Sequence, residues 1–191
     1  MFVAFTVTIN IVSNNYIFKP FENLKDKLET LSDTDPLTGV NNRRYFMKSA
    51  AMQIERLKRN NNESFVMLLD LDHFKQVNDN YGHQSGDIVL KEVASRVTAT
   101  LRPYDLFARY GGEEFIIFVA ELDEKSLIAL AERIRIEISN TPILAEGNTL
   151  SVTASLGVSL ATPINNLDDA IALADKALYK AKNEGRNRVV F

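Results

Sequence analysis

Two aspartates near the middle of the chain have the type and spacing to do chemistry. Asp70 and Asp72 stand at the end of an apolar, strand-like run, SFVMLLDLD, and side chains two apart on a strand point to the same face. That face is not plain core, because two unpaired buried carboxylates would cost several kcal/mol. Either the strand end is solvated, or the carboxylates hold a divalent cation such as Mg²⁺, which takes oxygen ligands together with substrate phosphates.

A second acidic motif, ARYGGEEFIIFV, interrupts what otherwise looks like a buried hairpin. Gly111 and Gly112 suit a two-residue hairpin turn, because glycine reaches positive φ without steric cost. The turn is either an ordinary solvated tip or a device that brings Glu113 or Glu114 to an ion beside Asp70. Acidic residues from two adjacent strands around Mg²⁺ are the recurring arrangement for nucleotidyl transfer, and glycine lets phosphates approach the backbone.

The elements that must position these carboxylates alternate between helix and strand. The hydrophobic spacing predicts helices at 42–59, 74–81, 85–101, 122–139 and 167–183, and strands at 64–71, 106–110, 115–120, 149–161 and 188–191. This order predicts an α/β (α+β) sandwich with a mixed, mostly antiparallel sheet flanked by helices. The turn-rich stretch SDTDPLTGVNNRR places a domain boundary near residue 33, with an N-terminal segment at 1–32 and one domain at 33–191.

The N-terminal segment carries two patterns of its own. Residues 1–12 are apolar but shorter than the roughly 20 residues that a membrane-spanning helix needs, so they are either the cytoplasmic end of a truncated spanning helix or an ordinary apolar segment. A two-heptad a/d stripe follows, which favours either a signalling helix that pairs with its twin in a homodimer or a helix packed on its own domain; its members are Ile17, Phe21, Leu24, Leu28 and Leu31.

Composition limits the function classes. Hydrophobic residues make up 46% and charged residues 25%, which is typical of a globular protein. The net charge of −3 gives no basic field for nucleic acid, so an anionic ligand must be held by local cations or a metal. The chain has no cysteine, which excludes disulfides and a cysteine nucleophile and fits a reducing compartment.

Four motifs in this order, DPLTGVNNRRYF, DLDHFKQVNDNYGHQSGD, RYGGEEF and ADKALYKAKNEGRNRV, resemble those of GGDEF-domain diguanylate cyclases, with the GGEEF variant of the signature. The resemblance covers residues 33–191 and implies a fold like the nucleotide-cyclase and polymerase palm core. It implies an enzyme that joins two GTP molecules into cyclic di-GMP and releases two pyrophosphates. It also implies a cytoplasmic location, either free or on the inner face of the membrane as part of a longer protein.

Carried over residue by residue, the resemblance assigns the reacting centre. Asp70 and Glu113 would bind Mg²⁺, or Mn²⁺ in its place, together with the backbone carbonyl of Leu71. Glu113 would also accept the proton of the 3′-hydroxyl. Glu114 would be a second-line ligand, with a solvent-facing turn residue as its alternative. Lys75 would neutralise charge that develops on the phosphates.

The resemblance also assigns the substrate contacts. Asn78 and Asp87 would bind guanine, because an ionised carboxylate accepts from the two donors of that base; a helix N-cap is the alternative for Asp87. Lys182 and Arg186 would contact the terminal phosphates, and the alternative for both is a simple interaction with the helix dipole. His83 would contact the substrate, and its alternative is a histidine at a helix start. The other substrate positions are Phe74, which is expected to pack, and Gly111 and Gly112 at the turn.

A further motif precedes the glycine turn. RPYD, from Arg102 to Asp105, has the register of the product-inhibition site found in part of this family, and Arg133 occupies the position of a second product-contacting arginine. The alternative is a surface salt bridge worth under about 1 kcal/mol. Two functions therefore remain open from the sequence: an active diguanylate cyclase, and a non-catalytic module of the same fold that binds GTP or cyclic di-GMP.

Overall fold

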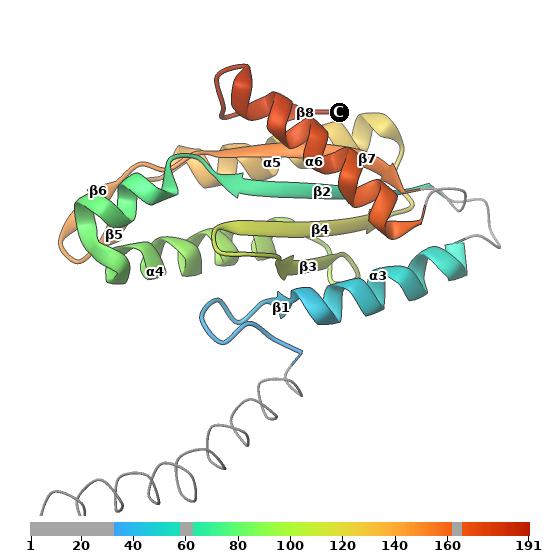
Figure 1. Cartoon of the computed structure of the whole chain (residues 1–191), viewed down its shortest axis with the longest axis horizontal. Coiled ribbons are helices and arrows are strands. Elements are labelled where there is room, and N and C mark those ends of the chain that lie inside the picture. Colours follow the sequence, from blue (N-terminus) through green and yellow to red (C-terminus); the bar gives the residue numbers. More distant parts are fainter. Residues whose placement is uncertain (1–32, 58–62, 162–165) are drawn as a thin grey trace, which may run out of the picture. The chain divides into compact units, whose positions relative to one another are not determined.

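The computed structural model describes residues 33–57, 63–161 and 166–191. The chain divides into two compact units, Met1–Asp33 and Thr34–Phe191, and every element described below lies in the second (Figure 1). The apolar residues 1–12 and the heptad stripe fall outside the described residues. Across the described ranges, no helix combines the length and apolarity needed to cross a bilayer.

Helices and strands follow each other in an order close to the predicted one. The helices are α3 (Arg43–Leu57), α4 (Phe74–Thr100), α5 (Glu124–Asn140) and α6 (Leu167–Asn183). The strands are β1 (Asn41–Asn42), β2 (Ser64–Leu71), β3 (Leu106–Arg109), β4 (Glu114–Ala120), β5 (Ile143–Ala145), β6 (Asn148–Leu150), β7 (Ala154–Ala161) and β8 (Val189–Val190).

Six of these strands form one sheet in the order β1-β3-β4-β2-β7-β8. The three central pairings are antiparallel, whereas the two edge strands β1 and β8 run parallel to their neighbours. The predicted mixed, mostly antiparallel α/β architecture is therefore confirmed. The edge strands are two residues long, which leaves little unpaired backbone at the outer edges formed by these strands.

The alternating side chains of the sheet build two hydrophobic cores. On one face, α4 and α5 cover alternate residues of β2 such as Met67 and Leu69. On the other face, α3 and α6 cover Val66 and Leu68. Figure 1 shows α6 running along β2 and β7. The approach of α6 is close because Gly157 faces it: a Cβ at this glycine would collide with backbone atoms of α6.

One predicted break is confirmed and one predicted strand is divided. The helices predicted at 74–81 and 85–101 are two helices within the span of α4, separated at Gly82, whose φ of 82° and ψ of 161° lie outside the helical region. The strand region predicted at 149–161 is interrupted. Residues 148–150 form a separate small hairpin with β5, and β7 begins only at Ala154, after a link whose Thr153 carbonyl accepts from Asp72 N–H (2.9 Å).

Candidate active site

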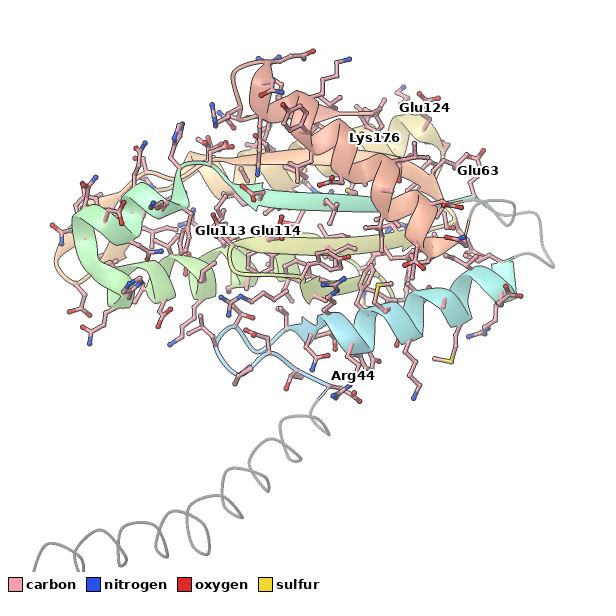
Figure 2. The ribbon with its side chains drawn as sticks, in the orientation of Figure 1. Arg44, Glu63, Glu113, Glu114, Glu124 and Lys176 are labelled. Carbon is pink, nitrogen blue, oxygen red and sulfur yellow. The ribbon has the colours of Figure 1, made fainter. Side chains whose placement is uncertain are left out.

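The sheet register places the two acidic motifs side by side. Asp70 on β2 is directly opposite Glu114 on β4, and Leu71 N–H donates to the Glu113 carbonyl (3.4 Å). Glu113 and Glu114 lie at the N-terminal end of β4, directly after the glycine turn (Figure 2). The structure thus brings together the strand end and the turn that the sequence analysis selected.

The glycine turn is held closed from within and from outside. Tyr110 N–H and Gly111 N–H both donate to the Glu114 carbonyl, at 2.8 and 3.2 Å. A Cβ at Gly111 would lie 2.7 Å from Oε2 of Glu114, so a side chain there would displace the Glu114 carboxylate. The guanidinium of Arg109 donates to the Gly112 carbonyl through Nε (3.1 Å) and Nη2 (2.7 Å).

Arg109 is itself fixed by a residue far away in the sequence. Its Nη1 lies 3.3 Å from both carboxylate oxygens of Asp35, which also accepts from the backbone and hydroxyl of Thr38. Burial alone would raise the pKa of Asp35, but the Thr38 hydrogen bonds and the Arg109 charge together lower it. The sequence analysis missed this brace, and no motif spacing signals it because 74 residues separate the partners.

Asp70 is a buried carboxylate in a cationic setting. The residue is 7% exposed, and Nζ of Lys182 on α6 lies 2.9 Å from Oδ2. Burial raises the pKa of Asp70; the hydrogen bond and charge of Lys182 oppose this rise, the charge of Asp72 adds to it, and the charge of Arg186 opposes it. Burial followed by the charge of Asp70 raises the pKa of Glu114 in the same way.

These carboxylates fit a hard divalent cation by the chemistry of their donors. Within the described ranges, no group of three or more histidine, aspartate or glutamate side chains is gathered in metal-binding geometry. The strand end nevertheless offers the carboxylates of Asp70, Glu113 and Glu114 and the carbonyl of Leu71, which are oxygen donors of the kind that Mg²⁺ shares with substrate phosphates. The pKa values of Asp70 and Glu114 are raised, and a bound cation would stabilise the ionised form of both carboxyl groups.

Asp72 differs from Asp70 in its partners. It is 6% exposed, so the interpretation of a solvated strand end is wrong for both aspartates. Oδ1 accepts from Ser155 Oγ (2.7 Å), and Oδ2 accepts from Thr153 Oγ1 (2.7 Å) and from the backbone N–H of Asn187 (3.0 Å). These partners belong to the β7 end and to the turn after α6.

The first half of α4 carries two of the predicted site residues at its surface side. Lys75 is exposed in the first turn, two residues after the left-handed His73. Asn78 is half-buried and points at Gly86 in the second half of the helix, where a Cβ would collide with its Oδ1. The Phe74 side chain is 7% exposed and belongs to the hydrophobic core, so it packs, as expected, and only its backbone is left for a ligand.

The second half of α4 carries His83 and Asp87. His83 is exposed and follows the Gly82 kink directly, which is the helix-start position considered for it. Asp87 is exposed and lies within the helix, next to the glycine that contacts Asn78. The N-cap interpretation of Asp87 is therefore wrong, because the helix does not begin there.

The last helix delivers two cations to the strand end. Lys182 reaches Asp70 from the last turn of α6. Arg186 follows the Schellman motif that ends this helix, in which Gly185 has a φ of 108° and Arg186 N–H donates to the Ala181 carbonyl (3.0 Å). Between α6 and the turn lies a pocket of about 250 Å³, lined by Glu114, Asp175, Lys176, Leu178, Tyr179 and Lys182.

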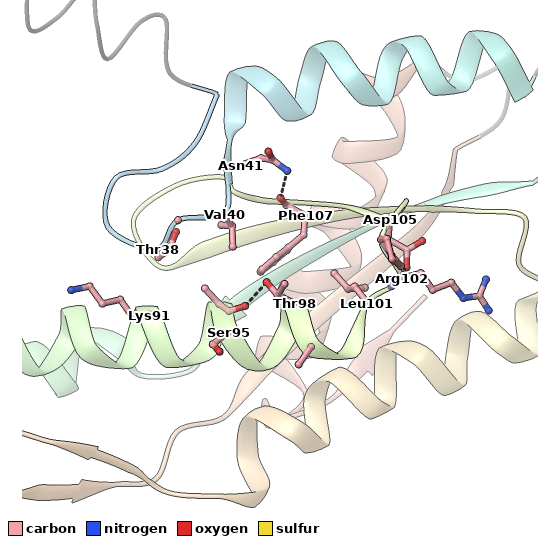
Figure 3. A pocket seen from close by; sticks show the side chains of 14 residues that line it. Thr38, Val40, Asn41, Lys91, Ser95, Thr98, Leu101, Arg102, Asp105 and Phe107 are labelled. Carbon is pink, nitrogen blue, oxygen red and sulfur yellow. Dashed lines mark hydrogen bonds between the residues drawn. The ribbon is translucent and has the colours of Figure 1, made fainter.

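The residues of the predicted inhibition site lie apart from this strand end in the sequence and in the contacts they make. Arg102 N–H donates to Oδ2 of Asp105 (2.8 Å), and Asp105 N–H donates to the Arg102 carbonyl (3.1 Å). Both residues line a pocket of about 790 Å³, with Lys91 at its other end (Figure 3). Arg133 on α5 does not line that pocket; its Nη2 donates to the Thr100 carbonyl (3.0 Å).

An antiparallel sheet that presents carboxylates at a strand end beneath a glycine turn is typical of domains that transfer nucleotides with the help of metal ions. The chain belongs to the GGDEF family of diguanylate cyclase domains, because the family model "Diguanylate cyclase, GGDEF domain" matches residues 32–188. The resemblance inferred from the four motifs is thereby confirmed.

Individual relatives agree with this assignment. The response regulator PleD of Caulobacter vibrioides is 40% identical over 171 residues, which are 88% of this chain and 37% of PleD. The GGDEF domain of DgcB from Caulobacter crescentus, solved in complex with cyclic di-GMP, is 33% identical with a TM-score of 0.80, covering 83% of this chain and 95% of that domain. The active GGEEF domain of a diguanylate cyclase from Vibrio cholerae is 32% identical with a TM-score of 0.72, covering 78% and 95%.

Proposed function

We propose that the chain is a diguanylate cyclase that condenses two GTP molecules into cyclic di-GMP and two pyrophosphates, with residues 33–191 as its catalytic domain. The observation that carries the proposal is the register that sets Asp70 opposite Glu114, with Glu113 beside them and Lys182 and Arg186 supplied by the end of α6. A cytoplasmic setting follows from GTP as the substrate.

The reacting centre is formed by Asp70, Leu71 and Glu113, with Glu114 as a further ligand. Their oxygen atoms would hold Mg²⁺, or Mn²⁺ in its place, which when bound lowers the pKa of the attacking hydroxyl and stabilises charge on the phosphates. Glu113 accepts the proton of the 3′-hydroxyl of one GTP while the 3′-oxygen forms a bond to the α-phosphorus of the other GTP. The bond from that phosphorus to the bridging oxygen breaks, and pyrophosphate leaves with the bonding electrons.

The remaining residues bind and orient GTP. Asn78 and Asp87 bind the guanine edge: the Asp87 carboxylate accepts hydrogen bonds from it, and the Asn78 amide can accept or donate. Asn78 lies against Gly86, the residue before Asp87. Lys75 neutralises the charge that develops on the phosphates, and Lys182 and Arg186 bind the terminal phosphates. Lys182 exchanges its bond to Asp70 for a phosphate when the substrate binds, because the carboxylate is then needed by the metal.

Two chains are needed for one product. The site has a single guanine-binding pair, whereas cyclic di-GMP contains two guanosines joined by two identical bonds. Two domains must therefore face each other about a two-fold axis, so that the 3′-hydroxyl of the GTP on each domain meets the α-phosphate of the GTP on the other. We assign the pairing of the domains to the heptad stripe within residues 1–32.

Product feedback is the third element of the proposal. Arg102, Asp105 and Arg133 would bind cyclic di-GMP through its guanine bases and phosphates, for which arginine is suited by its bidentate geometry. The pocket beside Arg102 and Asp105 supports this assignment, because the residues that line it do not include those of the reacting centre.

The test is incubation of the purified chain with GTP and Mg²⁺, followed by separation of the nucleotides. We expect cyclic di-GMP, and the rate per chain should fall over a hundredfold dilution as dimers dissociate. Glu113→Gln should abolish product formation while the domain still folds, as judged by circular dichroism. GTP that binds without turnover would favour the non-catalytic module instead, and an active Glu113→Gln variant would remove the assigned role of Glu113.

A further inference from the structure

Asp72 is a buried carboxylate whose hydrogen bonds lead away from the metal ligands. Both of its oxygens are engaged, by Ser155 and Thr153 at the β7 end and by the backbone N–H of Asn187. A buried carboxylate is retained at low cost only when such donors satisfy it. The partners identify what Asp72 holds: the turn that joins α6 to β8 (Figure 1).

That turn is the one that presents Arg186. Arg186 and Asn187 both have left-handed backbones, with φ of 60° and 44°. Residues other than glycine adopt this conformation at a cost and keep it only where their surroundings enforce it. In the described part of the chain, Asp72 accepts from the backbone N–H of Asn187 and not from Arg186, so Asn187 is the point at which the turn is fixed.

Asn187 is held from two sides. Its backbone N–H donates to Asp72, and its side-chain Oδ1 accepts from Nη1 of Arg135 on α5 (2.8 Å). Arg135 is only 19% exposed and is oriented by an ion pair with Glu132 (2.8 Å). The turn is therefore clamped between the end of β2 and α5, while the charge of Arg186 reaches Asp70, where it opposes the burial that raises the pKa of that carboxylate.

We propose that Asp72 is a positioning residue and not a metal ligand: together with Arg135 it clamps Asn187 and so fixes Arg186 for the terminal phosphates of GTP. The inference rests on the proposed function for the role of Arg186, and on the hydrogen bonds alone for the clamp.

The decisive variants are Asp72→Asn and Asp72→Ala. An asparagine can keep an oxygen acceptor for the Asn187 N–H while its amide donates to Ser155, whose hydroxyl rotates to accept. Alanine loses these two interactions and the hydrogen bond from Thr153. We expect Asp72→Ala to raise the KM for GTP at least about tenfold, the scale of a lost charged phosphate contact, with kcat and the half-activating Mg²⁺ concentration each within about threefold. Asp72→Asn should recover most of this loss.

Mn²⁺ binding, followed by electron paramagnetic resonance, supplies a readout other than activity. A metal ligand replaced by asparagine would weaken Mn²⁺ binding and raise the half-activating Mg²⁺ concentration; this result for Asp72→Asn would overturn the proposal. A wild-type KM in Asp72→Ala would overturn it as well. Asp70→Asn is the comparison in which loss of Mn²⁺ binding is expected.

A second pair of variants covers the case in which Asp72→Ala does not fold. Arg135→Met removes the other half of the clamp from a half-buried helix position, and Glu132→Gln removes the ion pair while leaving the Arg135–Asn187 hydrogen bond. Arg135→Met should raise the KM for GTP several-fold, and Glu132→Gln should raise it less. Equal KM values for these two variants and the wild type would refute the clamp.

Amide hydrogen exchange separates this inference from the proposed function. The Asn187 N–H should exchange slowly in the wild type and in Asp72→Asn, and about tenfold or more faster in Asp72→Ala and Arg135→Met. Wild-type chain that converts no GTP would refute the proposed function, whereas an unprotected Asn187 amide in the wild type would refute the clamp whatever the activity.

Discussion

Gly86→Ala should weaken substrate binding while leaving the domain folded. Gly86 lies in the second half of α4 with ordinary helical geometry, and its added Cβ would collide with Oδ1 of Asn78. The next contacts, to Cγ of Asn78 at 3.1 Å and to Cζ of Phe74 at 3.2 Å, are tight but not impossible. The change is therefore met by rotation of the Asn78 amide away from the helix.

The two effects can be sized separately. For the fold, alanine in a helix interior is favoured over glycine by roughly 0.5–1 kcal/mol, and crowding of Phe74 offsets this by a similar amount, about 1 kcal/mol at the lower end of overpacking costs. The net change in unfolding free energy should lie within about 1 kcal/mol. For binding, loss of the Asn78 contact with guanine removes a neutral hydrogen bond worth about 0.5–1.5 kcal/mol, which is roughly a 2- to 12-fold rise in KM.

Steady-state kinetics with GTP and urea unfolding measure the two quantities on the same preparations. Asn78→Ala should raise the KM to a similar extent as Gly86→Ala, and the double variant should add little, because both act on one contact. The reasoning is refuted if Gly86→Ala leaves the KM unchanged, or if it unfolds the domain, since the helix would then not accommodate the methyl group by moving Asn78.

Three further perturbations test other parts of the structure. Ser85→Ala should leave the unfolding free energy unchanged or raise it by up to about 1 kcal/mol, because its buried hydroxyl has no hydrogen-bond partner among the described residues; a clear loss in urea unfolding would contradict this. Asp35→Asn should lower the unfolding free energy by about 1–2 kcal/mol at pH 7. Because the pKa of Asp35 is lowered in the folded state, its stabilisation is present above its usual pKa of about 4 and is lost as the pH falls through the folded-state value. The unfolding free energies of the wild type and the variant should therefore converge in acid. Arg102→Ala should relieve inhibition by added cyclic di-GMP with little loss of initial rate, because the 102–105 loop is closed by the backbone N–H of Arg102 and not by its exposed side chain; unchanged inhibition curves would remove the site.

The local elements were predictable because their signals are local. The apolar run of β2, the helical spacing of α5 and α6 and the glycine end of α6 each depend on neighbouring residues and follow from period and chain chemistry. The family could also be inferred, because four motifs stood in the right order. The break before β7 could not be predicted, since it is marked by a backbone hydrogen bond from Asp72, which follows β2 and is distant in the sequence.

The different roles of Asp70 and Asp72 depend on tertiary structure. By spacing alone, Asp70 and Asp72 are equivalent residues of one strand end. They differ because α6 brings Lys182 to Asp70, whereas β7 and the turn after α6 bring hydroxyl and amide donors to Asp72. Such partners lie 81 to 115 residues away in the chain, and no local pattern records which donor will meet which carboxylate once the sheet has formed. The sequence by itself determined which chemical groups the protein has at this site, and packing between distant segments determined which partner each carboxylate meets.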